Sequence, residues 1–371
     1  MLNDVPILGT YLVHRRSPRF TGERMVTFAQ LKDRPELLTP DIRSPLFHPD
    51  QTMTVIWEGA PETSEVLCLA EWMDHPVALE HIPGTKVWGG DFPAPPLPPT
   101  VCTRVEIGDR TRVLPSFRHV PDVFGPDLPA TLPLTDPTST LVDDVWLPAT
   151  GFAERKRRVR IYQPHGRGVD AALDVLLVFD AQMAVDQSRW FPAMTDTLWQ
   201  QQRLPPLLVV AVDHAGRDRP REYIAGEIYN HAARQWISET VLPYVDAHHA
   251  ARAHWLLGTS LGASMALQVA AARPSLFAGG LFLSPWHQTG RAAVFDLVNH
   301  WPGGGRFFIS SGTFGKGEQQ HRVDTAELAE RLSARGAQVA YVEREGYGHA
   351  FAAWERILPE GLSWLFTETE E

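Results

Sequence analysis

The chain has 371 residues, of which 44% are hydrophobic and 21% charged, a balance typical of a globular protein with a sizeable core. This length allows about two domains. The formal net charge of −10 argues against nucleic acid or an anionic membrane as the main partner, and no apolar run approaches the roughly 20 residues that span a bilayer.

The ends of the chain and its cysteines indicate the compartment. Residues 1–6 lack a basic stretch followed by an apolar core, so we expect no secretory signal. Cys68 and Cys102 are the two cysteines, too few for a disulfide framework, and both fall in strand-like runs. We therefore expect a protein of a reducing compartment with two buried thiols.

The first third of the sequence is rich in strand signals. Short apolar and β-branched runs, separated by turn residues, occur at 54–57, 65–69, 86–88 and 103–107. This pattern predicts a small β-sandwich. Proline-rich stretches at 93–99 and 121–148 predict a rigid connection and a linker between domains. We therefore expect a β-sandwich domain with its linker over residues 1–140 and a second domain over 141–371.

A different pattern begins near residue 157. Near-continuous apolar runs at Leu173–Phe179 and Leu207–Val212 are typical of strands buried on both faces of a parallel sheet. Further strands are expected at 159–162, 280–283, 306–310 and 338–342, and helices at 190–202, 232–247 and 325–334. This alternation predicts an α/β fold with a mostly parallel sheet flanked by helices. We interpret the basic run 155–158 as a solvated strand entry.

The most informative motif is the pentapeptide Gly258-Thr259-Ser260-Leu261-Gly262. An apolar run ends at it and a helical pattern of small residues follows it. Strand, sharp turn and helix form the context in which Gly-x-Ser-x-Gly becomes a nucleophile elbow. The turn forces the serine into a strained backbone conformation, and the glycines avoid clashes with the adjoining strand and helix. We predict that Ser260 is a nucleophile.

A serine hydroxyl needs a base and an orienting acid, which follow it in the order acid, then histidine, in α/β-hydrolases. The loop after the last expected strand carries His349, flanked by Gly346 and Gly348, and we predict that His349 is the base. The loop after strand 306–310 offers Glu318, with Asp324 soon after. We favour Glu318 as the acid, since Asp324 is expected to cap the next helix.

The oxyanion of an acyl-transfer intermediate requires backbone N–H donors. We expect one donor at Leu261, directly after the nucleophile. The second should come from the loop that follows Leu173–Phe179, where Ala181 or Gln182 is the candidate and Ala181 is preferred.

Motifs beyond the elbow carry a resemblance to the enterochelin (enterobactin) esterase family. The run Phe179-Asp180-Ala181 resembles the family's strand-Asp-Gly loop, and Gly348 to Trp354 resembles its Gly-His-Asp-x-x-x-Trp ending. Residues 219–223 and 239–243 resemble its Arg-x-x-Glu-Leu and Glu-Leu-Leu-Pro elements. In the first domain, residues 82–88 resemble its Ile-x-Gly-Thr-x-Val-Trp run. The similarity spans roughly residues 50 to 365.

The resemblance implies an immunoglobulin-like N-terminal sandwich and an α/β-hydrolase catalytic domain. It implies a cytoplasmic serine esterase that opens the ester bonds of a catecholate trilactone siderophore to release iron, and it supports Glu318 as the acid. The sequence departs from the family at Ala181, at Ala350 and in the short segment 284–287. These positions are expected at the substrate pocket, so ester hydrolysis is better supported than the particular siderophore.

Three further residues are candidates for binding a small-molecule ester. Arg219 is expected to pair with acidic catecholate groups, with Glu222 holding it in place, and Trp190 and Trp286 to form an aromatic wall. Surface exposure for Arg219 and core packing for the tryptophans are the competing interpretations. His248, His249 and His254 lack companion ligands at metal spacing, so we expect no metal and no cofactor. A carbohydrate or aryl esterase and a catalytically inactive binding protein remain the alternative functions.

Overall fold

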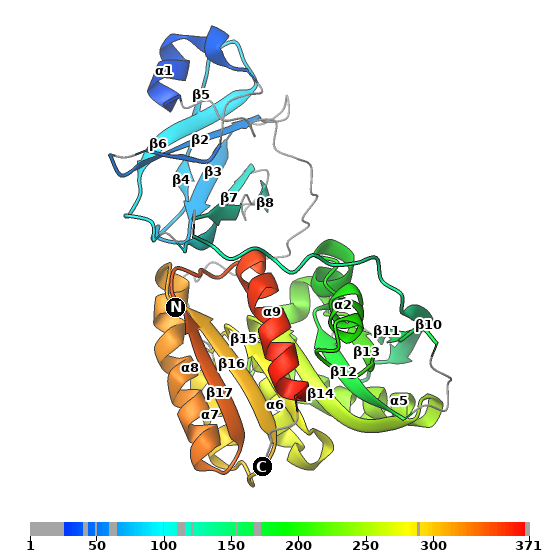
Figure 1. Cartoon of the computed structure of the whole chain (residues 1–371). Coiled ribbons are helices and arrows are strands. Elements are labelled where there is room, and N and C mark those ends of the chain that lie inside the picture. Colours follow the sequence, from blue (N-terminus) through cyan, green and yellow to red (C-terminus); the bar gives the residue numbers. More distant parts are fainter. Residues whose placement is uncertain are drawn as a thin grey trace. The chain divides into compact units, whose positions relative to one another are not determined.

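The computed structural model describes residues 26–39, 44–48, 50–58, 65–98, 100–109, 116–119, 122–125, 127–152, 155–166, 172–287 and 290–367. Residues 1–6, on which the expectation of no secretory signal rests, lie outside them, as do parts of the segment 121–148. The chain forms two compact units (Figure 1). The smaller unit comprises Met1–Leu128, Phe314–Gly317 and Glu345–Ala352, and the larger one comprises Pro129–Thr313, Glu318–Arg344 and Ala353–Glu371.

The smaller unit contains two antiparallel sheets. One has the order β1 (Leu46–Phe47), β2 (Thr52–Glu58), β6 (Val87–Pro93), β5 (Glu80–His81). The other has the order β4 (Val77–Ala78), β3 (Val66–Ala70), β7 (Cys102–Asp109), β8 (Ser116–His119), and β9 (Asp122–Phe124) also pairs with β7. Met53 and Val55 of β2 share a buried core with residues of β3 and β7. Cys68 and Cys102 are buried thiols, as predicted.

A short helix covers part of the first sheet. Helix α1 (Phe28–Asp33) begins at a capping box, in which Thr27 and Gln30 satisfy each other's backbone N–H groups. Phe28 and Leu31 pack with Ile82 and Val87 in a second small core. A 3₁₀ turn, η1 (Pro35–Leu37), follows it. The run 82–88 forms the connection between β5 and β6 and the first two residues of β6. The immunoglobulin-like topology of this unit stays a prediction.

The larger unit is built on one eight-stranded sheet. Its strand order is β10 (Thr140–Pro148), β11 (Lys156–Gln163), β13 (Leu207–Val212), β12 (Leu173–Phe179), β14 (Ala251–Thr259), β15 (Gly279–Leu283), β16 (Arg306–Gly312), β17 (Gln338–Arg344). β10 pairs antiparallel with β11, and β11 antiparallel with β13, whereas the neighbours from β13 to β17 run parallel. The sheet is therefore mixed, which corrects the expectation of a mostly parallel sheet.

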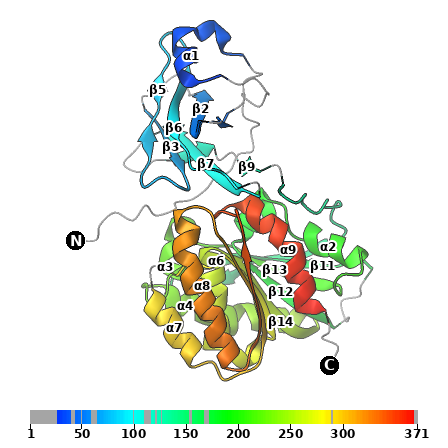
Figure 2. The ribbon, with the colours of Figure 1, turned by 60° about the vertical axis from the view of Figure 1, so that its left-hand side comes forward.

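Helices cover both faces of this sheet. Figure 2 shows α3 (Arg219–Tyr223), α4 (Asn230–Trp236), α6 (Leu261–Ala272), α7 (Arg291–Asn299) and α8 (Lys316–Ala334) on one face, and α2 (Ala193–Gln200) and α9 (Phe351–Phe366) on the other. Helix α5 (Leu242–His248) and the short segments η2 (Gln182–Gln187), η3 (Gly216–Asp218), η4 (Ile237–Val241) and η5 (Pro274–Leu276) complete the unit. Residues of α4 to α8 and the sheet form one large apolar core. In the described part of the chain, no helix is both long and apolar enough to span a bilayer.

The basic run 155–158 does not form a uniformly solvated strand entry. Arg157 is buried, and its guanidinium donates two hydrogen bonds to the Glu222 carboxylate, at 2.9 and 2.7 Å. Its neighbour Arg158 forms a similar fork with Asp144, but that pair is about one third exposed. Because successive side chains of a strand point to opposite faces, one arginine enters the core and the next stays at the surface.

Candidate active site

Ser260 lies at the turn between β14 and α6. Its backbone has φ 55° and ψ −128°, a conformation that costs a residue other than glycine free energy and concentrates at functional sites. The Ser260 N–H donates to the Leu283 carbonyl at 2.9 Å, and the Ser260 carbonyl accepts from the Trp286 N–H at 3.2 Å. The turn is thus tied on both sides to the end of β15, so the strain is held by the surrounding structure.

The two glycines of the motif are required by close packing. A Cβ atom on Gly258 would overlap with the backbone of Gly262. A Cβ atom on Gly262 would overlap with a carboxylate oxygen of Asp180. The first turn of α6 can therefore approach both β14 and the loop after β12, which places that loop beside the helix N-terminus.

The loop after β12 is held by side chains distant in sequence. Asp180 has φ 58°, and its carboxylate accepts two hydrogen bonds from the Arg219 guanidinium, at 2.7 and 2.6 Å. The Gln182 side chain donates to the His214 carbonyl and accepts from the His214 N–H, at 2.9 and 3.0 Å. Ala181, the preferred second oxyanion donor, is fully buried between these two anchors.

The electrostatics of this loop favour neutral groups around one fixed ion pair. Burial lowers the pKa of His214 to about 4, and its Nδ1 accepts a hydrogen bond from the Gly216 N–H at 2.9 Å. Burial raises the pKa of Tyr223 well above its usual range. The Arg219 guanidinium lies 5.3 Å from the centre of the Tyr223 ring.

The structure gives Arg219 a protein partner that the sequence did not indicate. Its guanidinium is bound to Asp180, in a bidentate pair that is largely buried. The Glu222 carboxylate, expected to hold Arg219, binds Arg157. Sequence inspection missed the partner because Asp180 lies 39 residues before Arg219.

The two candidate acids have different surroundings. Glu318 lies in the first turn of α8, not in a loop as expected, and is 1% exposed. One of its carboxylate oxygens accepts from the N–H of Gly312, the last residue of β16, at 2.8 Å. Asp324 lies within α8 rather than at its start, and accepts from Arg291 at 2.8 Å. The structure thus places Glu318 at the carboxyl end of the sheet and gives Asp324 a separate partner.

His349 lies in the segment Glu345–Ala352, which belongs to the smaller unit, whereas Ser260 and Glu318 belong to the larger one. Its side chain is buried, and its backbone N–H donates to an oxygen of Glu71 at 3.1 Å. Sequence inspection missed Glu71, which stands 278 residues earlier and belongs to no recognisable motif.

The two candidate tryptophans lie in different environments. Trp190 is 1% exposed, so its burial favours the packing interpretation over an aromatic wall. Trp286 is partly buried beside the core, and its ring centre lies 3.9 Å from that of His321. Its backbone N–H donates to the Ser260 carbonyl. Trp286 is therefore a neighbour of the Ser260 turn.

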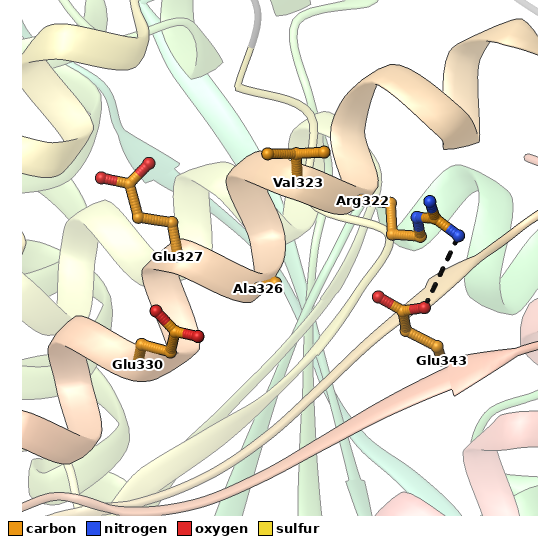
Figure 3. A pocket seen from close by; sticks show the side chains of 6 residues that line it. All are labelled: Arg322, Val323, Ala326, Glu327, Glu330 and Glu343. Carbon is orange, nitrogen blue, oxygen red and sulfur yellow. Dashed lines mark ion pairs between the residues drawn. The ribbon is translucent and has the colours of Figure 1, made fainter.

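An open groove of about 460 Å³ lies over α8 and β17 (Figure 3). Its lining is rich in carboxylates, and Glu343 pairs with Arg322 across it at 3.7 Å. None of the candidate site residues lines it. Within the described ranges, no three His, Cys, Asp or Glu side chains gather in a way that could hold a metal ion.

Residues 151–365, more than half of the chain, match the family model described as a putative esterase. The chain belongs to this esterase family. It is therefore a carboxylic ester hydrolase, and the Ser260 turn lies within the matched residues. No curated protein sequence matches this esterase.

Solved structures similar to this esterase include the enterobactin esterase FES from Shigella flexneri in the presence of enterobactin. That match has a TM-score of 0.65 at 17% identity, covering 85% of this chain and 92% of the other. The enterochelin esterase from Shigella flexneri matches with a TM-score of 0.66 at 16% identity, covering 87% and 94%. The ferric enterobactin esterase from Salmonella typhimurium matches with a TM-score of 0.61 at 16% identity, covering 86% and 95%. The esterase thus has an enterochelin-esterase-like α/β-hydrolase fold.

Proposed function

We propose that this esterase hydrolyses the ester bonds of a catecholate trilactone siderophore of the enterobactin type in the cytoplasm, and so releases its iron. Ser260 is the nucleophile, His349 the general base and Glu318 the orienting acid. The observation that carries the proposal is the backbone of Ser260, a serine held at φ 55° between a parallel strand and a helix of an esterase-family fold.

The proposed reaction has two halves. Ser260 Oγ attacks the ester carbonyl carbon while His349 takes its proton, and the resulting oxyanion is bound by the N–H groups of Leu261 and Ala181. Collapse of this intermediate breaks the ester bond, and His349 gives its proton to the departing alcohol. Water, activated by His349, then attacks the acyl-enzyme, and the carboxylic acid leaves as Ser260 regains its proton.

The choice of Glu318 rests on its surroundings. Its carboxylate is buried at the end of β16, the strand whose following segment supplies the acid in the expected order. A buried carboxylate can orient an imidazole and stabilise its charged form without itself taking the proton. Asp324 is instead bound to Arg291 on α7, which suits a role in joining two helices.

The substrate class is supported by the extent of the fold similarity. The matched enterobactin esterases cover 85 to 87% of this chain, so the similarity includes residues of both units. Two of the similar Shigella flexneri structures are those of the enterobactin esterase in the presence of enterobactin and of 2,3-di-hydroxy-N-benzoyl-serine. The run 82–88, which resembles the family, forms the connection between β5 and β6 and the start of β6.

A second candidate function is the hydrolysis of carbohydrate or aryl esters. It is favoured by the departures at Ala181, Ala350 and Ser284–His287, and by the pairing of Arg219 with Asp180, which occupies two nitrogens of the guanidinium expected to meet an acidic catecholate. A catalytically inactive binding protein is the third candidate, and the strained Ser260 backbone argues against it because strain without chemistry only lowers stability.

Two experiments separate these candidates. A fluorophosphonate probe should label the wild-type protein but not Ser260→Ala, whereas an unlabelled wild type would establish the inactive alternative. Mass spectrometry of products from ferric and free enterobactin, a linear trimer and feruloyl sugars should show turnover of the trilactone. Preferred turnover of a feruloyl sugar would overturn the siderophore proposal and leave the serine mechanism standing.

A further inference from the structure

The loop that carries His349 is attached to the second sheet of the smaller unit. The Cys102 N–H donates to the Gly346 carbonyl at 3.0 Å, and the Gly348 N–H donates to the Cys102 carbonyl at 2.7 Å, which forms a parallel bridge between Cys102 and Tyr347. Cys102 is the first residue of β7. The backbone on both sides of Tyr347 is therefore held by the sheet of the smaller unit.

One residue of this unit contacts both segments that adjoin the candidate acid and base. Glu71 follows β3, and one oxygen of its carboxylate accepts from the His349 N–H at 3.1 Å and from the Thr103 hydroxyl at 2.7 Å. Its backbone carbonyl accepts from the Lys316 N–H at 2.9 Å. Lys316 is two residues before Glu318, so Glu71 holds the segment that leads into the acid and the backbone of the base.

Glycines make room for Glu71 in both segments. A Cβ atom on Gly348 would overlap with the bound carboxylate oxygen and lie 2.9 Å from the Thr103 hydroxyl oxygen. A Cβ atom on Gly315, which has φ 84°, would lie 2.9 Å from the Glu71 Cβ. Any larger residue at position 348 must displace the carboxylate, so Gly348 and Glu71 fit each other.

The Glu71 carboxylate belongs to a buried network of charged side chains. Its side chain is 10% exposed, and its other carboxylate oxygen lies 3.6 Å from the Arg104 guanidinium. Arg104 in turn pairs with Glu106 at 3.1 Å. An ionised acceptor forms a shorter and roughly twofold stronger hydrogen bond to a backbone N–H than a neutral one. This buried network can therefore fix the position of the His349 backbone.

We propose that Glu71 is a positioning residue for His349, which it holds through the His349 backbone within the smaller unit. The proposal rests on the proposed function, in which His349 is the base. Glu71 does not touch the ester. It fixes the position of the His349 backbone, from which the imidazole side chain extends. A misplacement of a reacting group by about 1 Å can cost about 100-fold in rate.

The test compares Glu71→Ala and Glu71→Gln with Glu80→Ala, a control that removes an exposed carboxylate of the same unit, paired only with Lys32 among the contacts described. With p-nitrophenyl butyrate as substrate and fluorophosphonate titration to count active sites, Glu71→Ala should lower kcat per labelled site about 10- to 100-fold, with KM changed less than about twofold. Glu71→Gln keeps the volume and one oxygen acceptor, so its kcat should fall between alanine and wild type. Glu80→Ala should match wild type.

A second variant keeps the test decisive if Glu71→Ala folds poorly. Gly348→Ala should lower kcat per labelled site in the wild-type background and have a smaller effect when combined with Glu71→Ala, because the added methyl group and the carboxylate compete for one space that alanine at position 71 leaves open. A wild-type kcat per labelled site in Glu71→Ala, or a mere loss of labelled sites, would overturn the positioning role. Retained activity in Ser260→Ala would instead overturn the proposed function.

Discussion

The neighbouring arginines Arg157 and Arg158 allow a matched test of what burial does to an ion pair. We expect Glu222→Ala to lower the free energy of unfolding by about 3–5 kcal/mol, because it leaves the Arg157 guanidinium buried without its carboxylate. The side chains of Arg157 and Glu222 are 3% and 1% exposed, so water cannot replace the lost hydrogen bonds. The Asp213 carbonyl, 3.2 Å from Arg157, would remain as an acceptor and keeps the expected loss within this range.

The control is the pair formed by Arg158 and Asp144. It is also bidentate, with two hydrogen bonds of 2.7 Å that Arg158 donates through Nε and Nη2, but its side chains are 33% and 37% exposed. Exposed pairs contribute little because solvent screens the charges and ordering the side chains costs entropy. Asp144→Ala should therefore lower the free energy of unfolding by less than about 1 kcal/mol.

Urea unfolding, followed by far-ultraviolet circular dichroism, measures both changes as shifts of the midpoint. The double variant Arg157→Met with Glu222→Leu should recover most of the loss, since apolar residues of similar volume can replace a buried ion pair. Equal effects of Glu222→Ala and Asp144→Ala would refute the argument from burial. A double variant as unstable as Glu222→Ala would show that packing, and not an unbalanced charge, sets the loss.

Three further predictions concern the site and its surroundings. Arg219→Lys should lower kcat about tenfold with little change in KM, since lysine cannot form the fork that holds Asp180 and the Ala181 loop; a change confined to the KM of an anionic substrate would restore the ligand-binding role. Glu318→Ala should lower kcat about 10³- to 10⁴-fold and Asp324→Ala less than about twofold, and the reverse order would reassign the acid. Burial lowers the pKa of His287 to about 3 from 6.5, so the unfolded chain takes up a proton first as the pH falls below 6.5. His287 alone should lower the free energy of unfolding by about 2 kcal/mol between pH 7 and pH 5, beside the separate contribution of the buried His214, and His287→Leu should reduce the slope by that share; an unchanged slope would refute the assignment.

The strands of the large sheet could be predicted where burial on both faces leaves a simple pattern. The residues of Leu173–Phe179 and Leu207–Val212 are all buried, as their near-continuous apolar runs predicted. Strand β10 was not predicted, because most of its residues fall in the segment interpreted as a linker. It is an edge strand in which the apolar Leu141 and Trp146 are exposed, so its sequence does not alternate between buried apolar and exposed polar residues. That pairing is one of the antiparallel ones that make the sheet mixed.

The predicted helices were wrong or missing where the local sequence lacks the usual helical pattern. Helix α8 begins at Lys316, nine residues before the expected start at 325, because its first turns are polar and lack an apolar stripe. Glu318 therefore moved from an expected loop into a helix. Helix α9 was not expected, and Pro359 in its interior interrupts the usual helical pattern.

The candidate site could be read from the sequence as far as single motifs allow. Ser260 is recognisable because its turn depends on neighbouring residues. The partners of Arg219 and His349 are not, because Asp180 and Glu71 lie 39 and 278 residues away and contact them only in the folded chain.

The two units are interleaved along the sequence, and this limits how such proteins can be recombined. Phe314–Gly317 and Glu345–Ala352 belong to the smaller unit although they are flanked on both sides by residues of the larger one. A chimera joined at one point near residue 128 would combine a β-unit from one parent with these segments from another. Glu71 would then meet a foreign loop, and a residue other than glycine at position 348 would leave no space for its carboxylate. Exchange of substrate specificity between such esterases therefore requires that the β-unit and both segments be transferred together.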